Sequence, residues 1–129
     1  MTPADVASIV GSPDQIRQGI RSTREVRSKG LPILYYRSGV LSEIEFYREV
    51  ENVRFEEIQF FVDDGLECLR YLEARNGGAV VNVGAVLFQN LGLTTGRLDE
   101  AVVEAHTVTA FQKGLWDDKV VKFDRISFQ

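Results

Sequence analysis

Hydrophobic positions in the first part of the chain recur at helical spacing. Residues 4–10 form a short apolar-periodic segment that stops at Gly11. Residues 12–14, Ser-Pro-Asp, are typical of an N-cap and a first helical turn, which predicts a second helix from there to about residue 28. Its apolar face would hold Ile16, Ile20 and Thr23. We therefore expect a pair of helices at the N-terminus.

The rest of the chain alternates between the period of a strand and that of a helix. Short apolar or alternating runs predict strands at residues 32–36, 55–62, 79–88 and 120–128. The run at 79–88 is the most hydrophobic of these, so we expect it to be the central strand. Capping signals and helical spacing predict helices at residues 42–51 and 97–113.

Residues 66–74 fit two interpretations. An acidic N-cap at Asp64 and a stop at Asn76 and Gly77 favour a helix, with leucines at helical spacing between them. Asp64-Gly65 and Asn76-Gly77 are also hairpin-turn pairs, which would make the same residues the middle strand of a meander. We prefer the helix.

The interleaved helices and strands predict an α/β or α+β fold. The 129 residues suit one domain, residues 1–129, with a core large enough to need no disulfide or metal. We expect one sheet of roughly four strands covered by helices, together with the N-terminal helical pair.

Composition places the chain among ordinary globular proteins. It is 44% hydrophobic and 26% charged. Its only cysteine, Cys68, cannot form an internal disulfide, and with one histidine it cannot complete a Cys/His zinc tetrad. Asp5 lies where a signal peptide would have a basic start, and no apolar stretch is long enough to span a membrane. We expect a cytoplasmic protein without a cofactor, a structural metal or a membrane contact.

Charge is distributed unevenly along the chain. Up to Arg37 there are six basic and three acidic residues, and the remainder has nine basic and sixteen acidic residues. On the expected second helix Arg17, Arg21 and Arg24 would form a row that suits an anionic partner such as a phosphate backbone. The segment around Gly11 also resembles, in part, a helix-turn-helix. A solvated helix face is the simpler interpretation, because the pI of about 5.0 is low for a nucleic-acid-binding domain.

Two polar residues within apolar segments are candidates for a pocket. His106 is the only histidine, so any imidazole base must be this residue, and a catalytic role would need an orienting acid or carbonyl from elsewhere in the fold. Asn82 interrupts a run that should be buried, so it either faces a ligand cavity or hydrogen-bonds a neighbouring loop.

The sequence contains no phosphate-binding or other cofactor motif, whereas it has adjacent aromatic pairs at residues 35–36, 46–47 and 60–61. We therefore expect a small non-catalytic binding or regulatory protein that acts through protein–protein contacts and forms a homodimer. One alternative is a nucleic-acid-binding regulator that uses the three arginines. Another is a small hydrolase or isomerase with His106 as its base.

Overall fold

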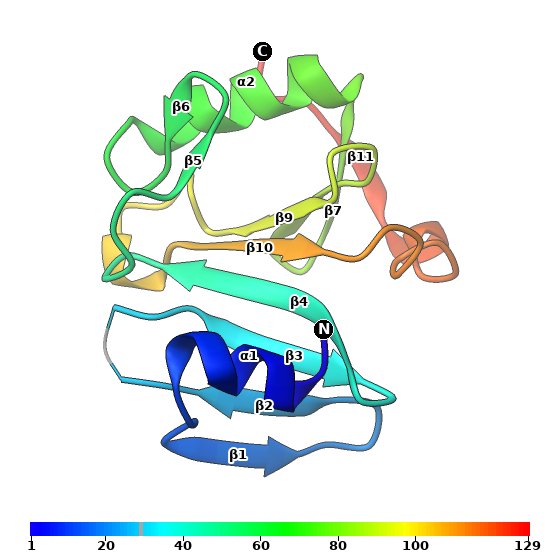
Figure 1. Ribbon diagram of the computed structural model, residues 1–129. Helices are drawn as coiled ribbons and strands as arrows, with labels where there is room; N and C mark the ends of the chain where they lie inside the picture. Colours follow the sequence, from blue (N-terminus) through cyan, green and yellow to red (C-terminus); the bar gives the residue numbers. More distant parts are fainter. Residues whose placement is uncertain (29) are drawn as a thin grey trace.

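The computed structural model describes residues 1–28 and 30–129, and these residues form a largely antiparallel β structure (Figure 1). Nine strands make one sheet in the order β1-β2-β3-β4-β10-β9-β8-β7-β11, and every neighbouring pair is antiparallel. In chain order its strands are β1 (Gln15–Gln18), β2 (Thr23–Val26), β3 (Ile33–Arg37), β4 (Val40–Tyr47), β7 (Ala79–Asn82), β8 (Ala85–Phe88), β9 (Leu93–Gly96), β10 (Thr107–Phe111) and β11 (Asp124–Ile126).

The smaller elements lie outside this sheet. The described residues contain two α-helices, α1 (Pro3–Val10) and α2 (Gly65–Asn76), and two short 3-10 turns, η1 (Val103–Ala105) and η2 (Val120–Lys122). A separate two-stranded ladder pairs β5 (Arg54–Phe55) with β6 (Ile58–Gln59). The predicted four-stranded sheet covered by helices, with an N-terminal helical pair, is therefore wrong.

The sheet consists of two meanders joined side by side. β1 to β4 form one run of hairpins and β7 to β10 the other, and β4 pairs with β10 at the junction. β11 returns from the C-terminus to pair with β7. Strands of the large sheet that follow one another in the sequence are thus hydrogen-bonded neighbours, except where β4 pairs with β10 and where β11 pairs with β7.

The second helix predicted at the N-terminus is instead the β1–β2 hairpin. The Gly19 amide donates to the Ser22 carbonyl at 2.8 Å and closes the turn. The face expected to be buried is in water, since Ile16 is 63% and Ile20 104% exposed. Without a partner for that face a helix here gains nothing from burial, whereas the hairpin gains a ladder with β3. The partial resemblance to a helix-turn-helix is therefore wrong as well.

Two other predicted helices, at residues 42–51 and 97–113, are wrong because these segments contain strands that pair with each other. Residues 42–51 fall mostly in β4, where Ile44 and Phe46 pack toward the core while Glu43 and Glu45 alternate with them. Residues 97–113 form a turn, η1 and β10. Both segments fit two patterns at once: apolar residues at helical spacing, and an alternation that contains β-branched or aromatic residues. Because β4 and β10 pair with each other, both segments form strands.

The run at residues 79–88 is a hairpin and not one central strand. Val83 and Gly84 both have positive φ, 50° and 79°, as a two-residue type I′ turn requires. Asn82 therefore pairs with Ala85 across the turn. The strand predicted at 55–62 is reduced to the short β5–β6 ladder, and that at 120–128 to η2 and β11.

Several elements appear as predicted. α1 and β3 match residues 4–10 and 32–36 closely. α2 confirms the helix at 66–74 against the meander, because the Asp64 side chain accepts a hydrogen bond from the Glu67 amide and Gly77 ends the helix with φ 82°. These elements are set by signals within a few residues of the chain.

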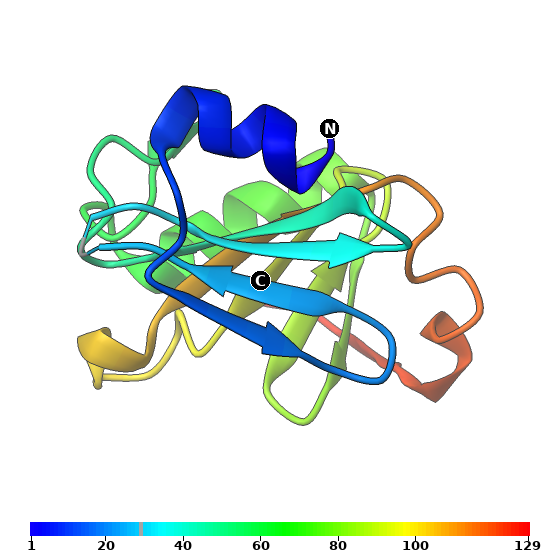
Figure 2. The ribbon, with the colours of Figure 1, turned by 60° about the horizontal axis from the view of Figure 1, so that its bottom comes forward.

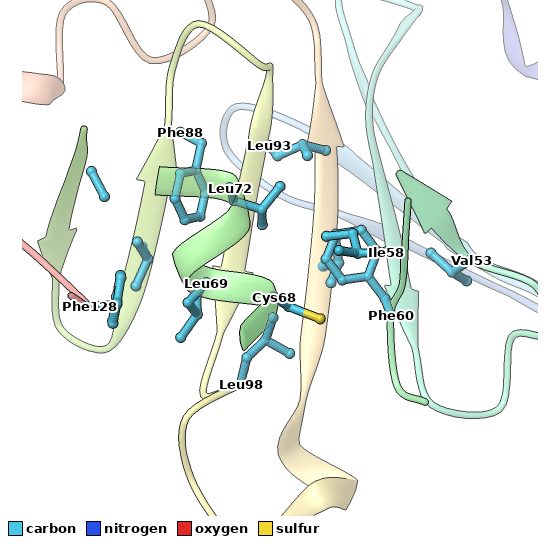
Figure 3. Packing of buried hydrophobic residues seen from close by; sticks show 13 residues of the cluster. Val53, Ile58, Phe60, Cys68, Leu69, Leu72, Phe88, Leu93, Leu98 and Phe128 are labelled. Atoms are coloured by element: carbon cyan, nitrogen blue, oxygen red, sulfur yellow. The ribbon is translucent and has the colours of Figure 1, made fainter. Parts of the chain in front are cut away.

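Both helices cover the same face of the sheet. Leu34, Ile44, Ala110, Leu93 and Phe88 are successive cross-strand partners, so they lie on one face. Val6 of α1 is buried in one cluster with Leu34 and Tyr36, and Leu69 and Leu72 of α2 are buried in another with Phe88 and Val108. Figure 2 shows α1 lying over the part of the sheet that contains β3 and β4, and Figure 3 shows Leu72 of α2 beside Phe88. The opposite face, which we call the open face, is covered by neither helix.

No helix among the described residues is long and apolar enough to cross a membrane. The cytoplasmic location stays a prediction.

Candidate functional site

β1 is an edge strand that pairs on one side only, at the end of the sheet (Figure 1). All four of its residues are exposed. In an antiparallel pair, hydrogen-bonded and non-hydrogen-bonded positions alternate. The Gly19 amide donates to the Ser22 carbonyl, so Gly19 is at a hydrogen-bonded position of the β1–β2 pair, and so is Arg17, two residues earlier. Ile16 and Gln18 are at the positions between, and their N–H and C=O groups therefore point away from β2. The edge therefore offers two free donors and two free acceptors.

The structure brings Arg17 and Arg24 together as direct cross-strand partners, with Arg21 in the connecting turn. The expected helical row is absent, yet the cluster itself exists. Within the described residues Arg17 and Arg21 form no ion pair. Like charges directly opposite one another destabilise a hairpin, so the pairing of Arg17 with Arg24 does not stabilise the fold.

A hollow of about 350 Å³ lies beside the arginine pair, lined by Gln15, Ile16, Arg17, Arg24 and Val26. The Arg24 Nε atom donates to the Tyr35 hydroxyl at 3.3 Å, and that hydroxyl donates to Glu45 Oε1 at 2.8 Å. Burial raises the pKa of Tyr35, so the phenol stays neutral and holds Arg24 in place. One guanidinium is thus fixed and the other is free.

The charges on the covered face of the same hairpin are already neutralised. Glu25 and Arg27 are 4% and 5% exposed. They form an ion pair in which Glu25 Oε1 lies 3.1 Å from Arg27 Nη1, but the two atoms are not oriented for a hydrogen bond. Arg27 Nε also donates to the Gly11 carbonyl at 3.0 Å, which ties the hairpin to the end of α1. Burial raises the pKa of the adjacent Tyr36 to about 12. The unneutralised charge of the hairpin is therefore on the open face.

His106 lies far from the arginines along the chain, directly before β10, and is 9% exposed. Its Nε2 atom is 2.7 Å from the Glu100 carbonyl, which supplies the orienting group that the sequence could not show. His106 lines a pocket of about 530 Å³ together with Asp63, Asp64 and Cys68. Burial raises the pKa of the Cys68 thiol to about 11, so Cys68 is a protonated core residue and lacks the lowered pKa of a nucleophilic cysteine.

Asn82 does not join this pocket. It ends β7 at the turn to β8 and is half-buried. The structure therefore separates the two residues that the sequence suggested for one pocket. Within the described part of the chain, no group of three or more His, Cys, Asp or Glu side chains is placed to hold a metal ion.

Sequence reasoning missed the free edge of β1. The signal was present, because β-branched Thr23 and Val26 flank Arg24 and Glu25, and Gly19 marks a turn between two alternating runs. Comparison of the chain with protein-family models, with curated proteins and with solved structures gave no match.

Proposed function

We propose that this protein is a non-catalytic binding module that takes up an extended, acidic segment of a partner protein along the free edge of β1. The observation that carries the proposal is the combination of the unpaired edge of β1 with two arginines that form no ion pair among the residues that the structure describes, Arg17 on β1 and its cross-strand partner Arg24 on β2. An extended peptide that adds to a sheet edge gains main-chain hydrogen bonds, and its alternate side chains give specificity.

The geometry defines the pattern of the segment. A strand paired with Ile16 and Gln18 sends alternate side chains to the two faces of the sheet. Those on the open face meet Arg17, Arg24 and the hollow beside them, which suits carboxylates. Those on the other face meet the exposed Ile16, which suits an apolar side chain. We expect a segment in which acidic and apolar residues alternate.

Charge argues against a second copy of the chain as the occupant of this edge. If Ile16 paired with Gln18 of another copy, Arg17 would lie opposite the other copy's Arg17, and like charges in that position repel. The homodimer stays a prediction from the sequence, and it would use a different surface.

Charge also argues against nucleic acid. Glu43 and Glu45 of β4 lie on the same open face as the arginines, two strands away from β2. Phosphates extending beyond the hairpin would meet these carboxylates. A short acidic peptide strand at the edge avoids them.

Peptide titration tests the proposal. A labelled peptide of alternating Glu and Val residues, and a matched peptide of alternating Lys and Val, would be titrated with the protein and followed by fluorescence anisotropy. We expect the acidic peptide to bind and the basic one not to bind. Arg17→Glu with Arg24→Glu should weaken binding by about tenfold or more, because like charges then face the peptide.

The matched control is Arg125→Glu, which reverses an exposed arginine on β11, the opposite edge of the sheet. It should leave the affinity unchanged. Gln18→Pro removes an amide that points outward and should also abolish binding. Equal binding of both peptides, or equal loss with Arg125→Glu, contradicts the proposal.

A further inference from the structure

The pocket that contains His106 is a second concave site, independent of the β1 edge. It lies between the segment that leads into α2 and the segment from Leu98 to His106, two regions far apart in the sequence. Its volume of about 530 Å³ is within the range of small-molecule sites.

The two walls are held at a fixed distance by a close backbone contact. A Cβ atom on Gly65 would overlap the Leu98 carbonyl oxygen, so only glycine allows α2 to begin there. Figure 3 shows Cys68 and Leu98 next to each other at this end of α2. The two walls of the pocket are therefore packed directly against each other at Gly65 and Leu98.

The floor is apolar apart from one ring nitrogen. Phe60, Cys68 and Leu98 are 3%, 2% and 5% exposed and line it together with His106. A carbonyl only accepts, so His106 Nε2 carries the proton shared with the Glu100 carbonyl. Nδ1, the other ring nitrogen of His106, has no hydrogen-bond partner among the described residues. It is also not completely enclosed by protein. In the neutral ring Nδ1 is a hydrogen-bond acceptor, and the residue that carries it lines the pocket.

The rim is acidic. Four carboxylates line it, those of Asp63, Asp64, Asp99 and Glu100, against one guanidinium, that of Arg48. Asp63 and Asp64 accept hydrogen bonds from the backbone amides of Gln59 and Glu67 at 2.8 and 3.2 Å. These bonds fix both carboxylates and leave them further acceptor capacity. Glu100 also pairs with Arg97 and Arg48 with Glu104, whereas Asp99 forms no ion pair within the described residues.

We propose that this pocket binds a small organic cation, a protonated primary amine attached to an apolar body. The apolar body fits the floor formed by Phe60, Cys68 and Leu98. The ammonium group has three donors, which fit the carboxylates of the rim and the free acceptor of His106. The partial positive charge at the start of α2 repels a cation. The Asp64 carboxylate caps this helix end, and together with the other carboxylates of the rim it exceeds that partial charge.

Nuclear magnetic resonance tests this proposal directly, because His106 is the only histidine and its imidazole signals need no assignment. Three probes of one shape would be titrated, namely phenethylamine, 2-phenylethanol and 3-phenylpropionate. They share an aromatic body and differ in charge. We expect the amine to shift the His106 signals with saturation below about 10 mM, the affinity range of a small single-site ligand, and the other two to bind several-fold more weakly.

Variants separate the site from non-specific effects. Asp99→Asn removes an exposed carboxylate that supports no other contact, and it should weaken the amine by about twofold to fivefold, as for one partly exposed ion pair. Asp118→Asn removes an exposed carboxylate outside the pocket and should change nothing. Ala101→Trp fills the mouth and should abolish the shift.

The proposal is overturned if phenethylamine leaves the His106 signals in place, if the alcohol or the carboxylate binds as well as the amine, or if Asp118→Asn weakens binding as much as Asp99→Asn. The peptide titration at β1 is unaffected by any of these results, so the two sites are tested separately.

Discussion

Glu43 shows how the open face of the sheet balances charge against burial. Its carboxylate lies 3.8 Å from the Arg37 guanidinium and is 17% exposed. Burial raises the pKa of Glu43, and the nearby cations Arg37 and Lys119 lower it only in part. The folded protein therefore binds the proton of Glu43 more tightly than the unfolded chain does.

This difference has a defined consequence for stability. The stabilisation linked to Glu43 is fully present below its ordinary pKa of 4.5 and is lost as the pH rises through the raised value. Glu43→Gln imitates the protonated acid at every pH, so we expect it to raise the urea midpoint at pH 7 and to change it little at pH 4. Glu51→Gln, at an exposed position, is the control. A larger gain at pH 4 than at pH 7 would show that the ion pair with Arg37 outweighs burial.

Gly65 determines how α2 meets the rest of the molecule. Replacing a glycine inside a helix by alanine ordinarily stabilises a protein, because it reduces the freedom of the unfolded chain. Here the added Cβ would overlap the Leu98 carbonyl, so either α2 or the segment after β9 must shift. We expect Gly65→Ala to destabilise the protein by about 1–3 kcal/mol, as overpacking does.

Thermal or urea unfolding measures this effect. The matched variant is Ala74→Gly at an exposed position in the same helix, which should cost about 0.5–1 kcal/mol through propensity alone. If Gly65→Ala stabilises the protein, the close approach of α2 to Leu98 is absent in solution.

The elements that could be predicted from the sequence are those with local signals. α2 was predictable because Asp64 and Gly77 cap it within the same short segment. β4 was not, because Ile44, Tyr47 and Val50 fit a helix as well as Ile44 and Phe46 fit a strand. Only the pairing of β4 with β3 and β10 decides between the two patterns, and those partners are distant in the sequence.

The same distinction applies to the candidate sites. Arg17 and Arg24 are seven residues apart, which places them on one side of a helix and, around the turn at Gly19, also opposite each other in a hairpin. Their proximity was predictable although the element was wrong. The pocket at His106 was not predictable, because its walls come from residues that only the fold of the sheet brings together.

At the scale of the whole molecule, burial falls from the α2-covered part of the sheet toward β1. Leu87, Phe88 and Val108 in β8 and β10 are 1%, 0% and 1% exposed, whereas β1 has no buried residue. Local opening is easiest where few apolar contacts must break. We therefore expect amide hydrogen exchange to be slowest in β8 and β10 and fastest in β1 among the strands of the large sheet.

This gradient gives the strand-addition proposal its most specific readout. The amides of Ile16 and Gln18 point away from β2, so they have no partner in the free protein, whereas the amide of Arg17 belongs to the β1–β2 ladder. Saturation with the acidic peptide should slow exchange at Ile16 and Gln18 by the largest factor in the chain, because each gains a main-chain hydrogen bond. Arg17 should gain less protection, and only because the hairpin opens less often. The amides of β11, at the other edge, serve as the internal control. If the peptide binds but protects all of β1 equally, it contacts the arginine side chains without extending the sheet, and strand addition is wrong.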